Sequence, residues 1–326
     1  MRTFDYTSPR TVDEAVRLLA DHPGADVIAG GTDLVTLLRD GIRTPTHLVD
    51  VNGLGLDEVS WQPGGAVRIG ALCRNAIDDP ALGRAYPVLV KALRAGASPQ
   101  IRNRATFGGN LLQSVRCPYF RLPEFACNRR TPGAGCAALH GDSRHHAIFG
   151  TSENCIAVHP SDCAVALLAL DAHVLVQSTR GTRRIPVAEL HRLPGRTPHE
   201  EHALRRDELI TAVELPAGPF GAHSTYVKAR DRASFAFALA SAAAVVAVRG
   251  GVVRRSRICL GGVAPKPWRS TAAEEALRGR PLDDAVIEAA ADAATRDAQT
   301  RPDNAYKVDL VHGVVRQALT ELREQS

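Results

Sequence analysis

The stretch ADVIAGGTDLVTLLRDG runs from Ala25 to Gly41 and contains three kinds of local structure in succession. Its apolar run from Asp26 to Ala29 predicts a short strand, and the apolar spacing from Asp33 to Arg39 predicts a helix. Gly30 and Gly31 lie between the two, where backbone N–H groups and the start of a helix can face an anion such as a pyrophosphate. An isolated glycine pair is more often a tight turn that needs a positive φ, so this stretch alone does not decide between the two readings.

The flanking residues predict a small α/β subdomain over residues 1–53. Thr11 with Glu14 three residues later is typical of a helix N-cap, and THLVDV from Thr46 to Val51 predicts the next strand. No third glycine completes a G-x-G-x-x-G fingerprint after Gly30 and Gly31, which disfavours a standard Rossmann dehydrogenase.

The remaining chain predicts a second subdomain over residues 54–219 and a C-terminal α+β domain over residues 220–326. In the C-terminal domain, two β-rich runs meet at Gly250 and Gly251, which indicates a hairpin, and three helical patterns follow. In the second subdomain we expect strands over residues 66–72, 173–179 and 208–216, a helix over residues 86–96, and a second helix for which Ser161 is the N-cap.

Composition places the chain among globular proteins of about two domains, because 44% of its 326 residues are hydrophobic and 23% are charged. The net charge of +5 is spread along the chain, and a nucleic-acid-binding protein would need a clustered basic patch. No run approaches the ~20 apolar residues of a membrane span, and the first residues lack the apolar region of a secretory signal. From the chain alone we expect a cytoplasmic protein.

A second glycine pair, Gly108 and Gly109, lies in RNRATFGGNLLQ between the small polar residues Thr106 and Asn110. Hydroxyl, amide and backbone groups of this kind suit a phosphate or a ribose. Two such loops in one N-terminal region favour a nucleotide cofactor.

Four of the seven cysteines gather in one stretch, from Cys117 to Cys155, which we call the cysteine segment. Nine, eight and eighteen residues separate Cys117, Cys127, Cys136 and Cys155, so no C-x2-C pair suggests a zinc ribbon or a thioredoxin-like motif. Four thiolates match the ligand set of a 4Fe-4S cluster. Structural zinc, disulfides and free thiols remain as alternatives.

The other cysteines, Cys73, Cys163 and Cys259, lie in apolar runs and are expected to be small buried hydrophobic residues. Four histidines lie in or beside the cysteine segment. Because four cysteines complete a ligand set, we interpret these histidines as neighbouring or surface groups: His140, His145, His146 and His159.

Five motifs occur in an order that resembles the FAD-binding medium subunits of the molybdenum hydroxylase (xanthine dehydrogenase) family. They are VIAGGTDLVTLL, RNRATFGGNLLQ, HPSD, YVKARDRASFAFALASAAAVV and LGGVAPKPWR, and the resemblance covers essentially the whole chain. The resemblance implies an α+β protein. Its FAD-binding domain would be of the vanillyl-alcohol-oxidase (PCMH) type, with two α/β subdomains, followed by a small flavoprotein domain with a three-stranded antiparallel sheet and helices.

The resemblance also implies which residues contact FAD. The first loop would wrap the pyrophosphate, the second would form another contact, and Lys228 would lie near the flavin, where a cation stabilises the anionic reduced form and raises the flavin potential. The implied residues are Ile28, Ala29, Gly30, Gly31, Thr32, Asp33, Leu34 and Val35, then Thr106, Gly109, Asn110, Asp162, Lys228 and, as a backbone contact, Ile210.

Most medium subunits lack the cysteine segment, whereas the periplasmic aldehyde oxidoreductases and the 4-hydroxybenzoyl-CoA reductases carry an additional 4Fe-4S cluster there. The segment is very similar to the aldehyde oxidoreductase version, which implies that Cys117, Cys127, Cys136 and Cys155 are cluster ligands. Nearby arginines would partly offset the cluster's negative charge and raise its potential: Arg116, Arg121, Arg129 and Arg130.

The implied function is electron transfer, with no catalytic residue for the organic substrate in this chain. A large partner subunit would hold the molybdenum cofactor, a small partner would hold two 2Fe-2S clusters, and FAD would pass electrons to an external acceptor. The alternatives are a structural subunit stabilised by an iron-sulfur cluster and a stand-alone flavin oxidase. Related complexes are exported through a twin-arginine signal on a partner, so the resemblance also allows a periplasmic location.

Overall fold

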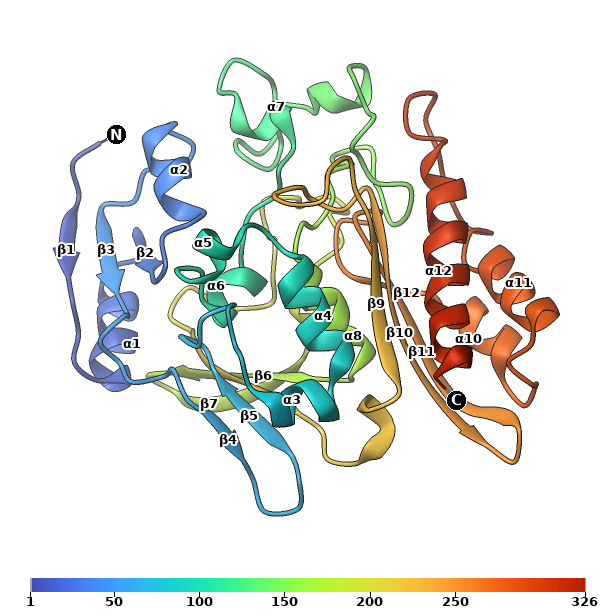
Figure 1. The fold of residues 1–326 in the computed structure, drawn as a ribbon. Coiled ribbons are helices and arrows are strands. Elements are labelled where there is room, and N and C mark those ends of the chain that lie inside the picture. Colours follow the sequence, from blue (N-terminus) through green and yellow to red (C-terminus); the bar gives the residue numbers. More distant parts are fainter. Residues whose placement is uncertain (1, 326) are drawn as a thin grey trace.

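The computed structural model describes residues 2–325, which form three sheets along the chain (Figure 1). The first is a parallel sheet with strand order β1-β3-β2, flanked by two helices. Thr11 caps the first helix as predicted, because its hydroxyl accepts a hydrogen bond from the Glu14 amide at 3.1 Å. The elements are β1 (Asp5–Thr7), α1 (Val12–Asp21), β2 (Ala25–Ile28), α2 (Leu34–Arg39) and β3 (His47–Asp50).

The second sheet is antiparallel with strand order β4-β5-β8-β6-β7, so the chain leaves it after β5 and returns to it after a long excursion. Its strands are β4 (Val59–Trp61), β5 (Val67–Gly70), β6 (His173–Ser178), β7 (Gly181–Pro186) and β8 (Leu209–Leu215). Its helices are α3 (Pro80–Ala85), α4 (Pro87–Ala95), α5 (Pro99–Arg102), α6 (Phe107–Leu111), α7 (Pro118–Arg121), the 3-10 turn Ala137–Leu139, α8 (Asp162–Ala169) and α9 (Val187–Leu190).

The third sheet has four strands in the order β12-β11-β10-β9, one more than expected. The additional strand covers only two residues, which is too short to leave a periodic pattern in the sequence. The predicted hairpin is β10 with β11, and three helices follow it. The elements are the 3-10 turn Pro219–Gly221, β9 (Ser224–Ala229), β10 (Ala240–Arg249), β11 (Val252–Gly261), β12 (Trp268–Arg269), α10 (Thr271–Leu277), α11 (Asp284–Ala293) and α12 (Lys307–Glu324).

This third sheet is buried on both faces, which explains why β10 is almost entirely apolar. Ala243 and Val245 point into the central core with α4 and α8, whereas Ala242, Ala244 and Val246 point into the core formed with α10, α11 and α12. The sheet therefore joins the C-terminal helices to the rest of the molecule (Figure 1). No helix within residues 2–325 is long and apolar enough to span a membrane.

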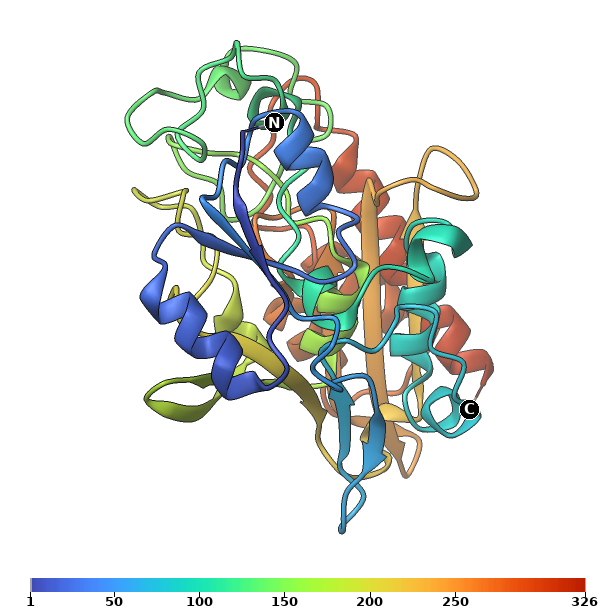
Figure 2. The same ribbon diagram turned by 90° about the vertical axis from the view of Figure 1, so that its left-hand side faces the viewer.

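The cysteine segment lies at the end of the molecule where α2 and the N-terminal end of the chain also lie (Figures 1 and 2). It has little regular structure, in agreement with its content of Pro, Gly and Asn. Its far end packs against the C-terminal domain: the Ile148 and Phe149 amides donate to the Val263 carbonyl, and the Phe149 ring stacks on Trp268 at 5.5 Å.

Candidate cofactor sites

A cavity of about 1600 Å³ lies between the first subdomain, the second sheet and the C-terminal domain. Both glycine loops, the start of α8 and the loop after β9 contribute to its walls. Most of the expected FAD contacts line it: Ala29, Gly30, Gly31, Thr32, Asp33, Leu34, Thr106, Gly109, Asn110, Asp162 and Ile210.

Three expected contacts do not line this cavity. Ile28 is half-buried at the end of β2, and the side chain of Val35 is largely exposed on α2. Lys228 is buried behind the cavity wall, with 3% of its side chain exposed.

Glycine is favoured at the two positions of the first loop for different physical reasons. Gly31 has a φ of +71°, which favours glycine. Gly30 lies so close to the second loop that a Cβ there would be 2.2 Å from the Arg104 carbonyl oxygen. The loops therefore touch through their backbones, and this contact brings residues far apart in the sequence to the same cavity.

The second loop is joined to the start of α8 by polar side chains. Thr106 caps α6, since its hydroxyl accepts from the Gly109 amide at 3.3 Å. The Asn110 amide oxygen accepts a short hydrogen bond from the Ser161 hydroxyl, which itself accepts from the Ala164 amide at 3.0 Å as the cap of α8. Ser161 was predicted as this cap, and its hydroxyl links two walls of the cavity.

Asp162, next to that cap, forms a buried charge network with two residues of β9. Lys228 donates to Asp162 Oδ2 at 2.7 Å and to the Ala95 carbonyl at 3.1 Å, and the Tyr226 hydroxyl donates to Asp162 Oδ1. Burial, followed by the nearby Asp162 charge, raises the pKa of Tyr226 well above its usual value. Lys228 thus acts on the cavity through Asp162 rather than from its surface.

Asp33, in the first loop, is held from the side of the cysteine segment. Its Oδ1 atom pairs with Arg116 at 2.6 Å and with Arg121 at 2.7 Å, and its Oδ2 atom accepts from the Ser114 amide at 2.8 Å. Both expected neighbours of a cluster, Arg116 and Arg121, are therefore bound to a carboxylate of the large cavity.

A second, much smaller cavity is lined by all four cysteines of the segment: Cys117, Cys127, Cys136 and Cys155. None of them is in a disulfide, and the backbones of Cys127 and Cys136 pair in an isolated β-bridge. Cys117 also lines the large cavity, so the two cavities share a wall. The other three cysteines, Cys73, Cys163 and Cys259, are buried as predicted.

Burial disfavours the charged thiolate form of two of these cysteines. Burial raises the pKa of Cys117 to about 12 and also raises that of Cys136. A bound metal ion reverses this preference, because it holds thiolates directly. Buried thiols of this kind suit metal binding, whereas a reactive surface cysteine needs an exposed and easily ionised thiol.

The groups around the thiols agree in part with expectation. Of the four arginines, only buried Arg129 contacts a cysteine sulfur, at 3.9 Å from Cys155 Sγ, and it also pairs with Glu201 at 3.2 Å. Arg130 donates instead to backbone carbonyls of the segment. His146 Nε2 lies 3.2 Å from Cys117 Sγ as a neighbouring group, and burial lowers the pKa of His146 to about 4. His140 and His145 are exposed, and His159 is buried.

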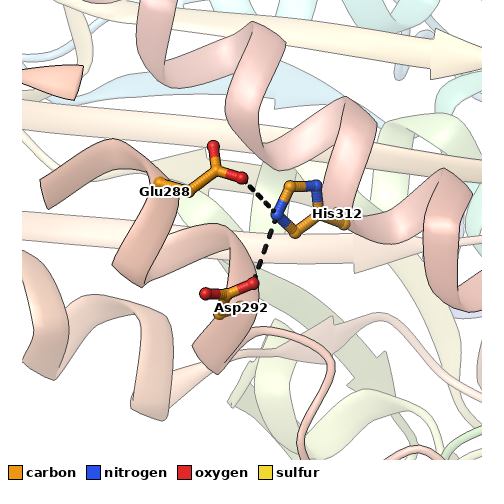
Figure 3. A group of neighbouring side chains, drawn as sticks. All are labelled: Glu288, Asp292 and His312. Atoms are coloured by element: carbon orange, nitrogen blue, oxygen red, sulfur yellow. Dashed lines mark ion pairs between the residues drawn. The ribbon is translucent and has the colours of Figure 1, made fainter. Parts of the chain in front are cut away.

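Within residues 2–325, the only three metal-ligating atoms that lie within 4.8 Å of one another belong to Glu288, Asp292 and His312. Figure 3 shows the histidine of α12 between two carboxylates of α11, with Nε2–O distances of 3.1 and 3.3 Å. These residues line neither cavity, and the contacts of the histidine with the two carboxylates account for their arrangement. The same finding means that no three cysteine sulfurs are this close together.

Comparison with known proteins identifies the family. The FAD binding domain of molybdopterin dehydrogenases matches residues 2–218, and the CO dehydrogenase flavoprotein C-terminal domain matches residues 224–322. The aldehyde oxidoreductase FAD-binding subunit PaoB of Escherichia coli (strain K12) is 47% identical, with 100% of both chains covered. The chain is a FAD-binding medium subunit of the molybdenum hydroxylase family.

More distant relatives extend this result to the fold of the medium subunit. The carbon monoxide dehydrogenase medium chain of Hydrogenophaga pseudoflava is 27% identical over 97% of this chain and 96% of its own. The solved structure of that organism's carbon monoxide dehydrogenase, in a form that lacks the Mo-pyranopterin moiety, matches with a TM-score of 0.76 at 26% identity, over 98% of this chain and 96% of that one. The predicted fold class is confirmed, and the medium subunit is part of an oxidoreductase.

Sequence reasoning missed the partners that hold the site residues in place. Nothing in the sequence pairs Asp33 with Arg116 and Arg121, or Asp162 with Tyr226, because the two residues of each pair are 64 to 88 positions apart. The density of arginines just before and within the cysteine segment was the one available signal. It predicts charge compensation for a cluster, and two of these arginines also pair with Asp33.

Proposed function

We propose that this medium subunit holds FAD in the large cavity and one 4Fe-4S cluster at Cys117, Cys127, Cys136 and Cys155, and that it carries electrons from partner subunits to an external acceptor. The observation that supports this most strongly is the shared wall: Cys117 lines both cavities. When bound, the cluster would exchange single electrons and FAD would couple one-electron to two-electron transfer. Two adjacent redox sites suit an electron relay.

The large cavity has the features needed for FAD. At about 1600 Å³ it exceeds the ~300–1,000 Å³ of sites for drug-sized ligands, as a dinucleotide requires. The glycine loops offer backbone N–H groups to a pyrophosphate, and Thr106 and Asn110 add polar side chains. We assign Asp162 to FAD binding, with Lys228 and Tyr226 fixing its carboxylate.

The spacing of the cysteines favours an iron-sulfur cluster over zinc. A tetrahedral zinc ion with Zn–S bonds of about 2.3 Å places its sulfur ligands about 3.8 Å apart. In the described part of the chain, no three cysteine sulfurs come within 4.8 Å of one another. A cubane cluster gives each thiolate its own iron, so its ligands are farther apart.

The organic substrate would react on a partner subunit that holds the molybdenum cofactor, with a small 2Fe-2S subunit between that partner and this chain. We propose an aldehyde as the substrate class, because a relative with 47% identity over its full length is named as an aldehyde oxidoreductase subunit. Export as a folded complex with a partner that carries a twin-arginine signal would then place the complex in the periplasm.

A second candidate function has one observation in its favour. Cys127 and Cys155 share a small hydrophobic core with Leu37 of α2, so a cluster there would also hold the first subdomain in place. In this structural alternative, loss of the cluster would leave reduction of the flavin intact.

The deciding experiment is cofactor analysis of the protein co-expressed with its partners. We expect about one FAD per chain and about four iron atoms beyond those of the partner's 2Fe-2S clusters, with this additional iron lost in Cys136→Ser and retained in the control Cys73→Ser. An iron content at the partner's level, or zinc in its place, would overturn the cluster and leave FAD standing. Unchanged flavin reduction in a Cys136→Ser protein that has lost the iron would favour the structural alternative.

A further inference from the structure

A cluster of ion pairs and hydrogen bonds at Asp33 joins the first glycine loop to the cysteine segment. We propose that FAD binding and the folding of the cysteine segment are coupled through Asp33, so that Arg121 is a positioning residue for FAD although it does not line the FAD cavity. This inference rests on the proposed FAD site, but it does not depend on which metal the cysteines bind.

The carboxylate of Asp33 is bound by residues that lie just before and within the cysteine segment. Arg116 and Arg121 share its Oδ1 atom, and the Ser114 amide donates to its Oδ2 atom, while only 16% of the side chain is exposed. A half-buried carboxylate with two guanidinium partners is held far more rigidly than an exposed ion pair. The first FAD loop therefore takes its position from residues that follow it by about 80 positions.

Arg121 also connects two further pieces of backbone. Its Nε atom donates to the Val115 carbonyl at 3.1 Å, and its Nη1 atom donates to the Thr36 hydroxyl at 3.3 Å. The Arg121 guanidinium thus connects the backbone just before Cys117 to both Asp33 and helix α2. If the cysteine segment unfolds, all these contacts are lost together.

Apolar packing repeats this connection independently of charge. A small core contains Leu37 of α2 together with Val115, Phe120 and two of the cysteines, with Ile42 and Cys117 packed at its edge. Helix α2 directly follows the glycine turn of the FAD loop. The segment and the loop therefore share a core and an ion-pair cluster, so the ordering of one favours the ordering of the other.

Coupling of this kind is reciprocal. A folded cysteine segment should strengthen FAD binding, and bound FAD should protect the segment from local unfolding. Loss of the metal would consequently weaken FAD binding, which links flavin retention to the state of the four cysteines.

The test uses Arg121→Gln in the full-length protein, with Arg39→Gln as the matched control. Arg39 lies on the same helix as Thr36, at the far end from the FAD loop, and its one ion-pair partner among residues 2–325 is Asp40. We expect Arg121→Gln to raise the Kd of FAD by about tenfold, within the ~5–150-fold range of such couplings, and Arg39→Gln to leave it within about twofold. Addition of Asp33→Asn then tests the route, because Arg121→Gln should have little further effect in that background.

Amide hydrogen exchange of residues 117–155 gives a second readout that needs neither activity nor iron. Removal of FAD should accelerate exchange in the wild type, and Arg121→Gln should abolish the difference. An unchanged FAD affinity in Arg121→Gln, equal effects of Arg121→Gln in both backgrounds, or exchange that is insensitive to FAD would overturn the coupling. Failure of the wild type to bind FAD would overturn the FAD site and the coupling with it, whereas FAD binding without iron would overturn only the cluster.

Discussion

Two buried lysines show how differently the same side chain can be accommodated. Lys228 has a carboxylate partner, Asp162, so its charge is compensated. Within residues 2–325, Lys307 has no ion-pair partner and donates one hydrogen bond, to the Gly262 carbonyl at 2.7 Å. Burial lowers the pKa of Lys307 from 10.5 to about 7, because the uncharged amine is easier to bury. Gly262 lines the FAD cavity, so Lys307 supports that wall from behind.

The lowered pKa of Lys307 makes a prediction about stability. Between pH 7 and 10.5 the unfolded chain holds a proton at this site and the folded chain does not, so this group makes the free energy of unfolding rise with pH in that window and fall as pH is lowered. Against Lys307→Met, which lacks this proton, the wild type should gain up to about 1.4 kcal/mol per pH unit. Urea unfolding of both proteins between about pH 7 and 9 measures this, and parallel profiles would contradict it.

Among the elements, those with clear end signals were predicted most accurately. Thr11 and Ser161 cap α1 and α8 as expected, and the hairpin turns at Gly250 and Gly251. The strands that were not predicted, β1, β4, β7, β9 and β12, all lie at the edge of a sheet and carry no clear apolar alternation. Their positions follow from pairing with distant strands, which local sequence does not encode.

The glycine turn between β2 and α2 gives a prediction at this scale. Gly30→Ala places a methyl group against the Arg104 carbonyl, which is backbone and cannot move aside, so we expect a loss of about 1–3 kcal/mol in unfolding free energy and weaker FAD binding. Gly83 in α3 has no atom near its Cβ position, and Gly83→Ala should instead add about 0.5–1 kcal/mol. Thermal unfolding and FAD titration measure both effects, and equal effects of the two variants would refute the close contact.

At the scale of the whole molecule, the cysteine segment contacts all three parts of the chain. It meets the first subdomain at Asp33, the second subdomain where Asn154 donates to the Gly195 carbonyl, and the C-terminal domain where Ser143 donates to Asp303. The Asp303 carboxylate accepts from both the amide and the hydroxyl of Ser143, at 3.1 and 3.2 Å. The cysteine segment therefore connects the three parts of the chain to one another.

Removal of the Asp303 contact tests whether the C-terminal domain holds the cysteine segment in place. Asp303→Ala leaves two donors of Ser143 without an acceptor, so we expect a cost of about 1–3 kcal/mol and faster tryptic cleavage after the exposed Arg144. Asp297→Ala, at an exposed position in the same C-terminal region, is the control and should leave the cleavage rate unchanged. Mass spectrometry of the digest gives both rates, and equal cleavage in the two variants would show that the contact does not hold the segment.

The sequence by itself determined the family, the order of the main elements, the two glycine loops and the grouping of four cysteines, because caps, turns and periodicity are local properties of the chain. It placed Ile28, Val35 and Lys228 at the FAD site, and none of these residues lines the cavity. The tertiary structure decided that Asp33 is held by Arg116 and Arg121, that Lys228 acts through Asp162, and that one cysteine lines both cavities. These features depend on contacts between residues far apart in the sequence, and such contacts form only when the separate parts of the chain pack together.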